Sequence, residues 1–198
     1  MPFSGRQRRT LRRMASLYPG PVRVGVSLDP GAMEAPELKT LRDWAALTPA
    51  VQFLVEDTLE DGSVPEIRIA SPQSPSPLMV MQGWPRGYEF VSLIQAAYLL
   101  AEPGPVRRMS GRGTVATLYT APTCPHSPVQ LRHLVRALAD AGQRGPLTVL
   151  DVTQMQGPTV PATPEVPLTM IARLDTTVTL VGVRPVEELT ELLGGTKS

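Results

Sequence analysis

The segment that decides the fold spans residues 117–134 and reads TLYTAPTCPHSPVQLRHL. Its first part alternates apolar and polar residues, which is typical of a strand over 114–120. After a short loop, apolar residues recur at helical spacing: Leu131, Leu134, Val135 and Leu138. The spacing predicts a helix over 125–141, so Cys124, the only cysteine of the chain, stands at the start of a helix.

This position has a chemical consequence for the Cys124 thiol. The first N–H groups of a helix have no partner within the helix, and the positive end of the helix dipole stabilises a thiolate. Cysteines in such positions have lowered pKa values, and the thiolate is the nucleophile of disulfide exchange. Pro125 suits a first helical turn because it has no N–H to leave unpaired. The alternative is that Cys124 is a small buried apolar residue. Its placement between a strand and a helix favours the reactive thiol.

The same order of elements occurs twice along the chain: a strand, a helix, three strands and a closing helix. In the first half we predict strands over 22–28, 51–55, 66–70 and 78–82, with helices over 34–47 and 88–101. In the second half we predict strands over 114–120, 147–152, 168–174 and 177–181, with helices over 125–141 and 185–193. Val-Pro precedes the third strand in each half, as Val64-Pro65 and Val166-Pro167. We interpret the chain as a tandem duplication.

The predicted fold class is α/β, with two similar units. Strands joined by a helical crossover pair in parallel, so we expect each half to form a mixed sheet with helices packed on both faces. The predicted units are residues 21–103 and 114–198, joined by a linker over 104–113 that is rich in Gly, Pro and Arg. Residues 1–20 are predicted to add a basic helix packed on the first unit.

The single cysteine limits the chemistry that the chain can perform. It excludes an internal disulfide, a dithiol redox pair and a zinc site made of several thiolates. His126 and His133 do not complete a metal-binding set with it, so we expect no metal. The sequence contains no GxGxxG fingerprint, so we expect neither FAD nor NADH to bind.

Charge and hydropathy limit the classes of partner that we expect the protein to bind. The formal charge of +1 over 198 residues is not typical of a nucleic-acid-binding protein. The first 20 residues carry five arginines and no acidic residue, which leaves 14 basic and 18 acidic residues in the remainder. No apolar run is long enough to cross a bilayer, and no signal-peptide core follows the basic start. We expect a cytoplasmic protein with no nucleic-acid or membrane partner, and the sequence predicts no oligomeric state.

Several motifs resemble those of the thioredoxin superfamily. Cys124-Pro125-His126-Ser127 stands where that superfamily has Cys-x-x-Cys, and Val166-Pro167 matches the Val/Thr-cis-Pro that faces the redox motif. A wider resemblance is to the amino-terminal domain of the alkyl hydroperoxide reductase flavoproteins, which has two tandem thioredoxin folds with redox cysteines only in the second. It rests on the stretch 87–93, on Pro128, and on Gly182 with the helix that follows.

The resemblance implies a site and a reaction. Cys124 would be the nucleophile, with Ser127 and His126 beside it, and Pro125, Val166 and Pro167 would contact the substrate. Because Ser127 replaces the second cysteine, the implied reaction is a monothiol, glutaredoxin-like exchange on a protein disulfide or mixed disulfide. Glutathione or another small thiol would be the co-substrate, with no bound cofactor. A peroxiredoxin is one partner that the resemblance implies.

Two alternatives remain open at this point, one for the role of Ser127 and one for the function of the protein. Ser127 either donates a hydrogen bond to the Cys124 thiolate or is favoured only as a helix-start residue. A protonated His126 would stabilise the thiolate, whereas His133 is predicted to be a solvated surface residue. The protein is either a thiol-disulfide oxidoreductase or a non-catalytic thioredoxin-like protein in which the degenerate motif is a docking surface.

Overall fold

The computed structural model describes residues 3–60, 62–72, 76–101, 114–142, 147–155, 165–173 and 176–194. The helices are α1 (Gly5–Ala15), η1 (Pro30–Glu34, a 3₁₀ helix), α2 (Pro36–Leu47), α3 (Gly87–Leu100), α4 (Ser127–Asp140) and α5 (Val186–Leu192). The strands are β1 (Val22–Leu28), β2 (Val51–Thr58), β3 (Glu66–Ala70), β4 (Met79–Gln82), β5 (Val115–Thr120), β6 (Leu147–Asp151), β7 (Leu168–Arg173) and β8 (Thr176–Val181). Every predicted strand and helix is present, and the predicted linker over 104–113 lies outside the described residues.

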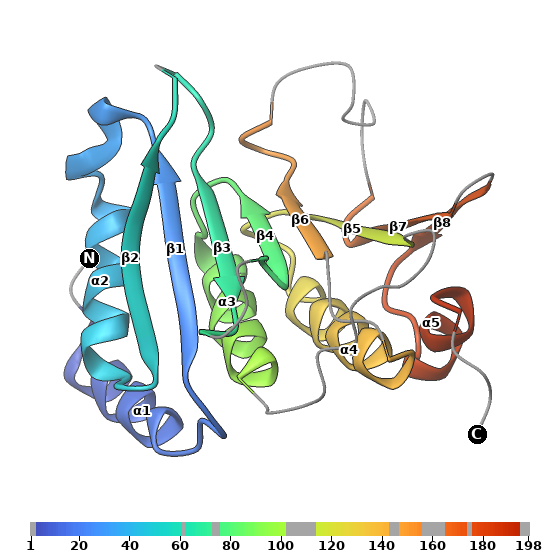
Figure 1. Cartoon of the computed structure of the whole chain (residues 1–198), viewed down its shortest axis with the longest axis horizontal. Helices are drawn as coiled ribbons and strands as arrows, with labels where there is room; N and C mark the ends of the chain where they lie inside the picture. The colour runs from blue at the N-terminus through green and yellow to red at the C-terminus, as the bar shows by residue number, and fades with distance from the viewer. Residues whose placement is uncertain are drawn as a thin grey trace.

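The strands form one continuous mixed sheet in the order β2-β1-β3-β4-β6-β5-β7-β8 (Figure 1). As predicted for a helical crossover, β1 pairs with β2 in parallel and β5 pairs with β6 in parallel. Each half contributes a mixed portion of the sheet, but the two portions are not separate sheets as expected. They join because β4 and β6 also pair in parallel, from Met79 with Leu147 to Gln82 with Leu150. These two strands would otherwise be sheet edges, and their pairing satisfies backbone groups that an edge leaves open.

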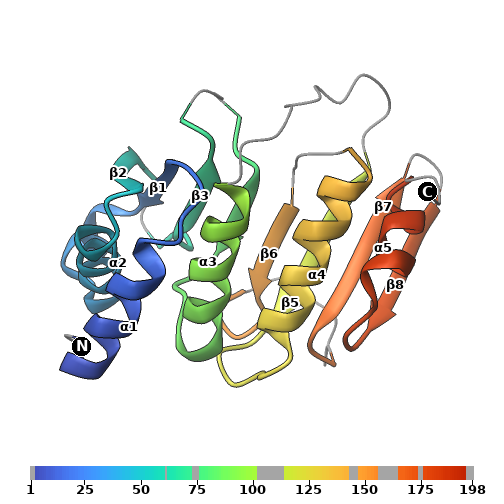
Figure 2. The ribbon, with the colours of Figure 1, turned by 90° about the horizontal axis from the view of Figure 1, so that it is seen from below.

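One face of the sheet carries the main core. Its inward-facing strand residues are Val24, Val26, Ile67, Ile69, Met79, Met81, Leu147, Val149, Ala116, Leu118, Ile171 and Leu180. Buried side chains from α1, α2, α3, α4 and α5 belong to the same cluster. Figures 1 and 2 show these five helices side by side along this face. Among the described residues, therefore, the expected helix layer on the second face is not found.

In the first half, the second face of the sheet carries charged side chains, so it needs no helix to cover it. Glu56 lies over β1, where a Cβ at Gly25 would overlap its carboxylate. The carboxylate forms ion pairs with Arg23, at 3.8 Å from Nε, and with Arg68, at 3.7 Å from Nη1. A charged face of this kind is solvated at little cost. In the second half the same face carries a small apolar cluster of Tyr119, Leu150 and Leu168.

Each half contains an equivalent backbone hydrogen bond, as expected of a duplication. Gly182 N donates to Pro167 O at 2.8 Å, and Gly83 N donates to Pro65 O at the same distance. Both glycines have positive φ angles, of 107° at Gly83 and 81° at Gly182. Among the described peptide bonds, only Val166–Pro167 is cis.

Candidate functional site

Cys124 lies in the turn that joins β5 to α4. Its backbone N–H donates to Ala121 O at 3.0 Å. The helix begins at Ser127, not at Pro125 as predicted, so Cys124 precedes the first helical turn by three positions. Pro128 accounts for the shift, because a helix that began at Pro125 would need the N–H of residue 128 to donate to Cys124 O, and proline has no N–H. The first bond of the helix is instead from Gln130 N to His126 O, at 3.0 Å. His126 occupies the N-cap position without a side-chain cap, and its side chain is exposed, as is that of Pro125.

The fold brings the Cys124 thiol against the Val166–Pro167 turn. Cys124 Sγ donates to the carbonyl oxygen of Val166 at 3.5 Å, although the two residues are 42 positions apart. Cys124 is buried, with 6% of its surface exposed. The juxtaposition that the resemblance implied is therefore present in the described structure.

Ser127 is the first residue of α4. It is fully buried, and its Oγ has no hydrogen-bond partner among the described residues. It therefore makes no hydrogen bond with the Cys124 sulfur, and its side chain caps no backbone N–H. A buried hydroxyl without a partner lowers stability by about 1–3 kcal/mol.

His133 is not a solvated surface residue, which corrects the prediction. It is half-buried, and its Nδ1 donates to Arg184 O at 2.7 Å. One turn earlier on α4, the fully buried Gln130 accepts from Arg184 N at 2.8 Å and donates to Thr169 Oγ1 at 2.9 Å. These bonds hold the turn after β8 and the strand that follows Pro167 against α4. The spacing of Gln130 and His133 on one helix face was the only sequence signal for this anchor.

Two buried carboxylates lie where the halves meet. Glu89 on α3 is 1% exposed, and Asp151 at the end of β6 is 2% exposed. Thr120 Oγ1 donates to Glu89 Oε1 at 2.5 Å, and Arg86 N donates to Glu89 Oε2 at 3.4 Å. Burial raises the pKa of Glu89 to about 7; the Thr120 hydrogen bond opposes this rise and the charge of Asp151 adds to it. The sequence pattern did not predict this pair, because its members come from different halves.

The start of α3 also supports the Cys124 loop directly. Tyr88 N donates to Pro122 O at 3.0 Å. Gly87 has a φ of 49°, and a Cβ there would overlap the same carbonyl oxygen. The first half thus holds one side of the loop that carries the cysteine.

Hydrogen bonds of the Gln154 side chain, here called the clamp, also join the two halves along their common boundary, here called the seam. Gln154 Oε1 accepts from Trp84 N at 2.8 Å, and Gln154 Nε2 donates to Trp84 O at 2.8 Å. Gln154 Nε2 also donates to Asp151 Oδ2. Asp151 Oδ1 accepts from Thr153 N at 2.8 Å and from Thr153 Oγ1 at 2.7 Å. The clamp joins the segment after β6 to the segment after β4.

Two further observations concern ligands and membranes. Within the described ranges, no three His, Cys, Asp or Glu side chains are grouped so as to hold a metal ion. In the same ranges, no helix combines the length and apolar character that a membrane crossing requires.

Comparison with known proteins places the fold. No protein-family model and no curated protein matches the sequence. Among solved structures, the alkylhydroperoxide reductase AhpF of Enterococcus faecalis is 17% identical with a TM-score of 0.72, over 98% of this chain and 100% of that chain. Its separate NTD_N/C domain is 18% identical with a TM-score of 0.72, over 97% and 100% of the two chains. A protein disulfide oxidoreductase of Aeropyrum pernix is 19% identical with a TM-score of 0.67, over 96% and 91%.

These likenesses extend over nearly the whole chain. At such identities they are evidence for the fold alone. The chain therefore has the α/β architecture of tandem thioredoxin-like folds, and the resemblance inferred from the motifs is confirmed at the level of structure.

Proposed function

We propose that this protein is a thiol-disulfide oxidoreductase that acts through Cys124 by a monothiol route. The observation that carries the proposal is the placement of Cys124 Sγ at 3.5 Å from Val166 O. A thiol at the carbonyl of an extended turn faces the backbone to which a peptide could bind as an added strand. The similarity in fold to a protein disulfide oxidoreductase supports the proposal.

The proposed reaction needs two exchanges and one small thiol. The Cys124 thiolate attacks the small-thiol sulfur of a protein mixed disulfide, forming a new disulfide with it and releasing the protein thiolate. A second small thiolate then attacks that disulfide, which regenerates the Cys124 thiolate and releases the oxidised small-molecule disulfide. The protein sulfur is reduced to a thiol, and the one free small thiol supplies the electrons as it becomes half of the released small-molecule disulfide. Ser127 cannot resolve the intermediate because a hydroxyl forms no stable bond to sulfur.

The partners proposed for this reaction follow from the same chemistry. The substrate is a glutathionylated protein or a protein disulfide, with a peroxiredoxin as one candidate, and glutathione or a similar thiol is the co-substrate. We propose that the reaction takes place in the cytoplasm, where a thiol pool stays reduced.

The direct test uses a glutathionylated peptide with glutathione in excess. We expect the protein to release the peptide thiol faster than glutathione alone, and Cys124→Ser to lose the whole enhancement. Thr123→Ser, at the exposed neighbouring position, is the matched control and should retain it. A rate equal to that with glutathione alone, together with alkylation of Cys124 that rises only near pH 8.5 as for an unperturbed cysteine, would refute the proposal.

The buried site of Ser127 yields a second prediction about the same thiol. Ser127→Cys should introduce disulfide reductase activity toward insulin, because a thiol there would stand three positions from Cys124, as in a dithiol motif. Ser27→Cys is the matched control, since Ser27 on β1 is also fully buried with an unpartnered Oγ but belongs to the first half. Equal activity of the two variants would contradict the prediction.

One observation favours a second function, that of a non-catalytic docking protein. Cys124 is 6% exposed, whereas reactive cysteines are usually in partly exposed settings. In that case the turn at Val166 and the exposed Pro125 and His126 would bind an extended segment without exchange. A partner bound equally well by the wild type and by Cys124→Ala, with no mixed disulfide formed, would favour this function.

A further inference from the structure

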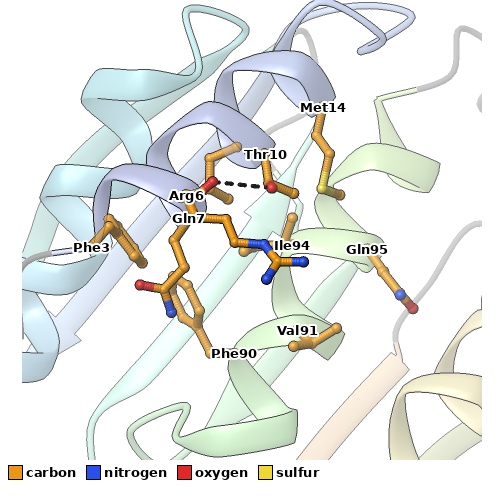
Figure 3. A pocket seen from close by; sticks show the side chains of 10 residues that line it. Phe3, Arg6, Gln7, Thr10, Met14, Phe90, Val91, Ile94 and Gln95 are labelled. Atoms are coloured by element: carbon orange, nitrogen blue, oxygen red, sulfur yellow. Dashed lines mark hydrogen bonds between the residues drawn. The ribbon is translucent and has the colours of Figure 1, made fainter.

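A cavity of about 400 Å³ lies between α1 and α3 (Figure 3), and no residue of the loop that carries Cys124 lines it. Its lining residues are Phe3, Arg6, Gln7, Thr10, Leu11, Met14, Phe90, Val91, Ile94 and Gln95. The volume is within the range of roughly 300–1,000 Å³ that is typical of small-molecule sites.

The lining is mainly apolar, and aromatic rings close one part of it. Phe3 and Phe90 stack with ring centroids 5.8 Å apart. Leu11 and Ile94 are buried, whereas Val91 is 42% exposed although it belongs to the lining. A hydrocarbon chain in the cavity would cover Val91 and gain the free energy of removing apolar surface from water.

Arg6 is the only ionisable side chain in the lining. Figure 3 shows its guanidinium reaching from α1 across to α3, beside Ile94. Among the described residues it forms no ion pair, and α1 contains no acidic residue that could supply one. The cavity thus combines an apolar interior with one unpaired positive charge.

We propose that this cavity binds a monomeric long-chain carboxylate, with its chain between α1 and α3 and its head group on Arg6. Charge complementarity selects the ligand, because a carboxylate can form two parallel hydrogen bonds with a guanidinium. A neutral chain of equal length would leave Arg6 unpaired, and a cationic one would be repelled. A protein partner or a second copy would cover roughly 20–30 residues on each side, and only ten line the cavity.

The first experiment compares four probes on the full-length protein by calorimetric titration. We expect laurate to bind tightly, and octanoate to bind at least about tenfold more weakly, since each methylene that becomes buried contributes up to about fourfold in affinity. Dodecanol tests the head group and dodecyltrimethylammonium tests the sign of the charge; both should bind several-fold more weakly than laurate. Amide chemical shifts that change on laurate binding should include those of Val91 and Ile94.

Two variants locate the site. Arg6→Gln should weaken laurate binding by about threefold to fivefold, the range of a partly exposed ion pair, and should leave dodecanol binding unchanged. Arg9→Gln is the matched control, because Arg9 is exposed on the same helix and does not line the cavity. Val91→Glu places a negative charge at the half-exposed lining position and should abolish laurate binding, with the circular dichroism spectrum unchanged.

Several results would overturn the proposal. They are equal laurate affinity of the Arg6→Gln and Arg9→Gln variants, dodecanol or the cationic chain binding as tightly as laurate, and laurate shifts confined to residues outside α1 and α3. Binding to anionic vesicles but not to monomeric laurate, or self-association that Val91→Glu abolishes while laurate has no effect, would also overturn it. None of these results bears on Cys124.

Discussion

At the scale of single residues, Glu89 is the carboxyl group whose pKa is most strongly shifted among the described residues. It is 1% exposed, and its pKa is raised from an ordinary 4.5 to about 7, mainly by burial. Between these two pH values the folded chain holds a proton that the unfolded chain has released. Stability therefore falls as pH rises through this window, by at most about 3 kcal/mol for a shift of this size.

Glu89→Gln should remove most of this pH dependence. An amide keeps an oxygen that can accept from Thr120 and carries no charge to desolvate, so the variant should be more stable than the wild type at pH 8 and similar to it at pH 5. Urea unfolding at a series of pH values measures the difference. Glu60→Gln, at an exposed position, should keep the wild-type slope. An unchanged slope in Glu89→Gln would show that Glu89 ionises normally.

At the scale of elements, the entry to α3 depends on a close backbone approach. Gly87 and Gly182 both have positive φ angles, of 49° and 81°. A Cβ at Gly182 would meet nothing within 4 Å, whereas one at Gly87 would overlap Pro122 O. Alanine substitutions at the two positions therefore distinguish the energetic cost of backbone strain from that of steric overlap.

Gly182→Ala should cost about 1–2 kcal/mol, the strain of a left-handed alanine. Gly87→Ala should cost clearly more, because α3 must also move away from the loop that carries Cys124. Chemical denaturation measures both values. The alkylation rate of Cys124 should change in Gly87→Ala and stay constant in Gly182→Ala. Equal losses of stability would mean that the start of α3 moves without cost.

At the scale of the whole molecule, the continuous core should couple the two halves. Leu134 on α4 in the second half and Trp44 on α2 in the first half belong to one cluster, and both are fully buried. The strand pair β4–β6 and the clamp of Gln154 on Trp84 add backbone and side-chain links across the seam.

Leu134→Ala should destabilise the chain by about 2–5 kcal/mol, as is usual for a buried leucine. Tryptophan fluorescence, which reports on Trp44 in the first half and on Trp84 at the seam, should shift its midpoint together with the circular dichroism signal of the whole chain. Separate transitions, with the fluorescence midpoint unmoved, would show that the halves unfold independently.

The prediction of elements succeeded where local pattern controls structure. Alternation fixed the limits of β1 and β3, which match the predicted 22–28 and 66–70 residue for residue. The start of α4 was placed two residues early, because Pro125 suits a first helical turn but the N–H that would close that turn is missing at Pro128. The helix stripe of α4 was correct, but its buried Gln130 and half-buried His133 are polar residues whose partners lie elsewhere in the chain.

By itself, the sequence determined the order of strands and helices, the two-fold repeat and the position of the one thiol between a strand and a helix. Those features follow from periodicity and from the backbone preferences of proline, which act over a few residues. Only the tertiary structure decided that the two halves share one sheet, that the described helices cover one face of it, and that Cys124 faces Val166. It also decided that Glu89 and Asp151 are buried together and that Arg6 overlies an apolar cavity. Each of these depends on burial and on contacts between residues far apart in the chain, which no local pattern encodes.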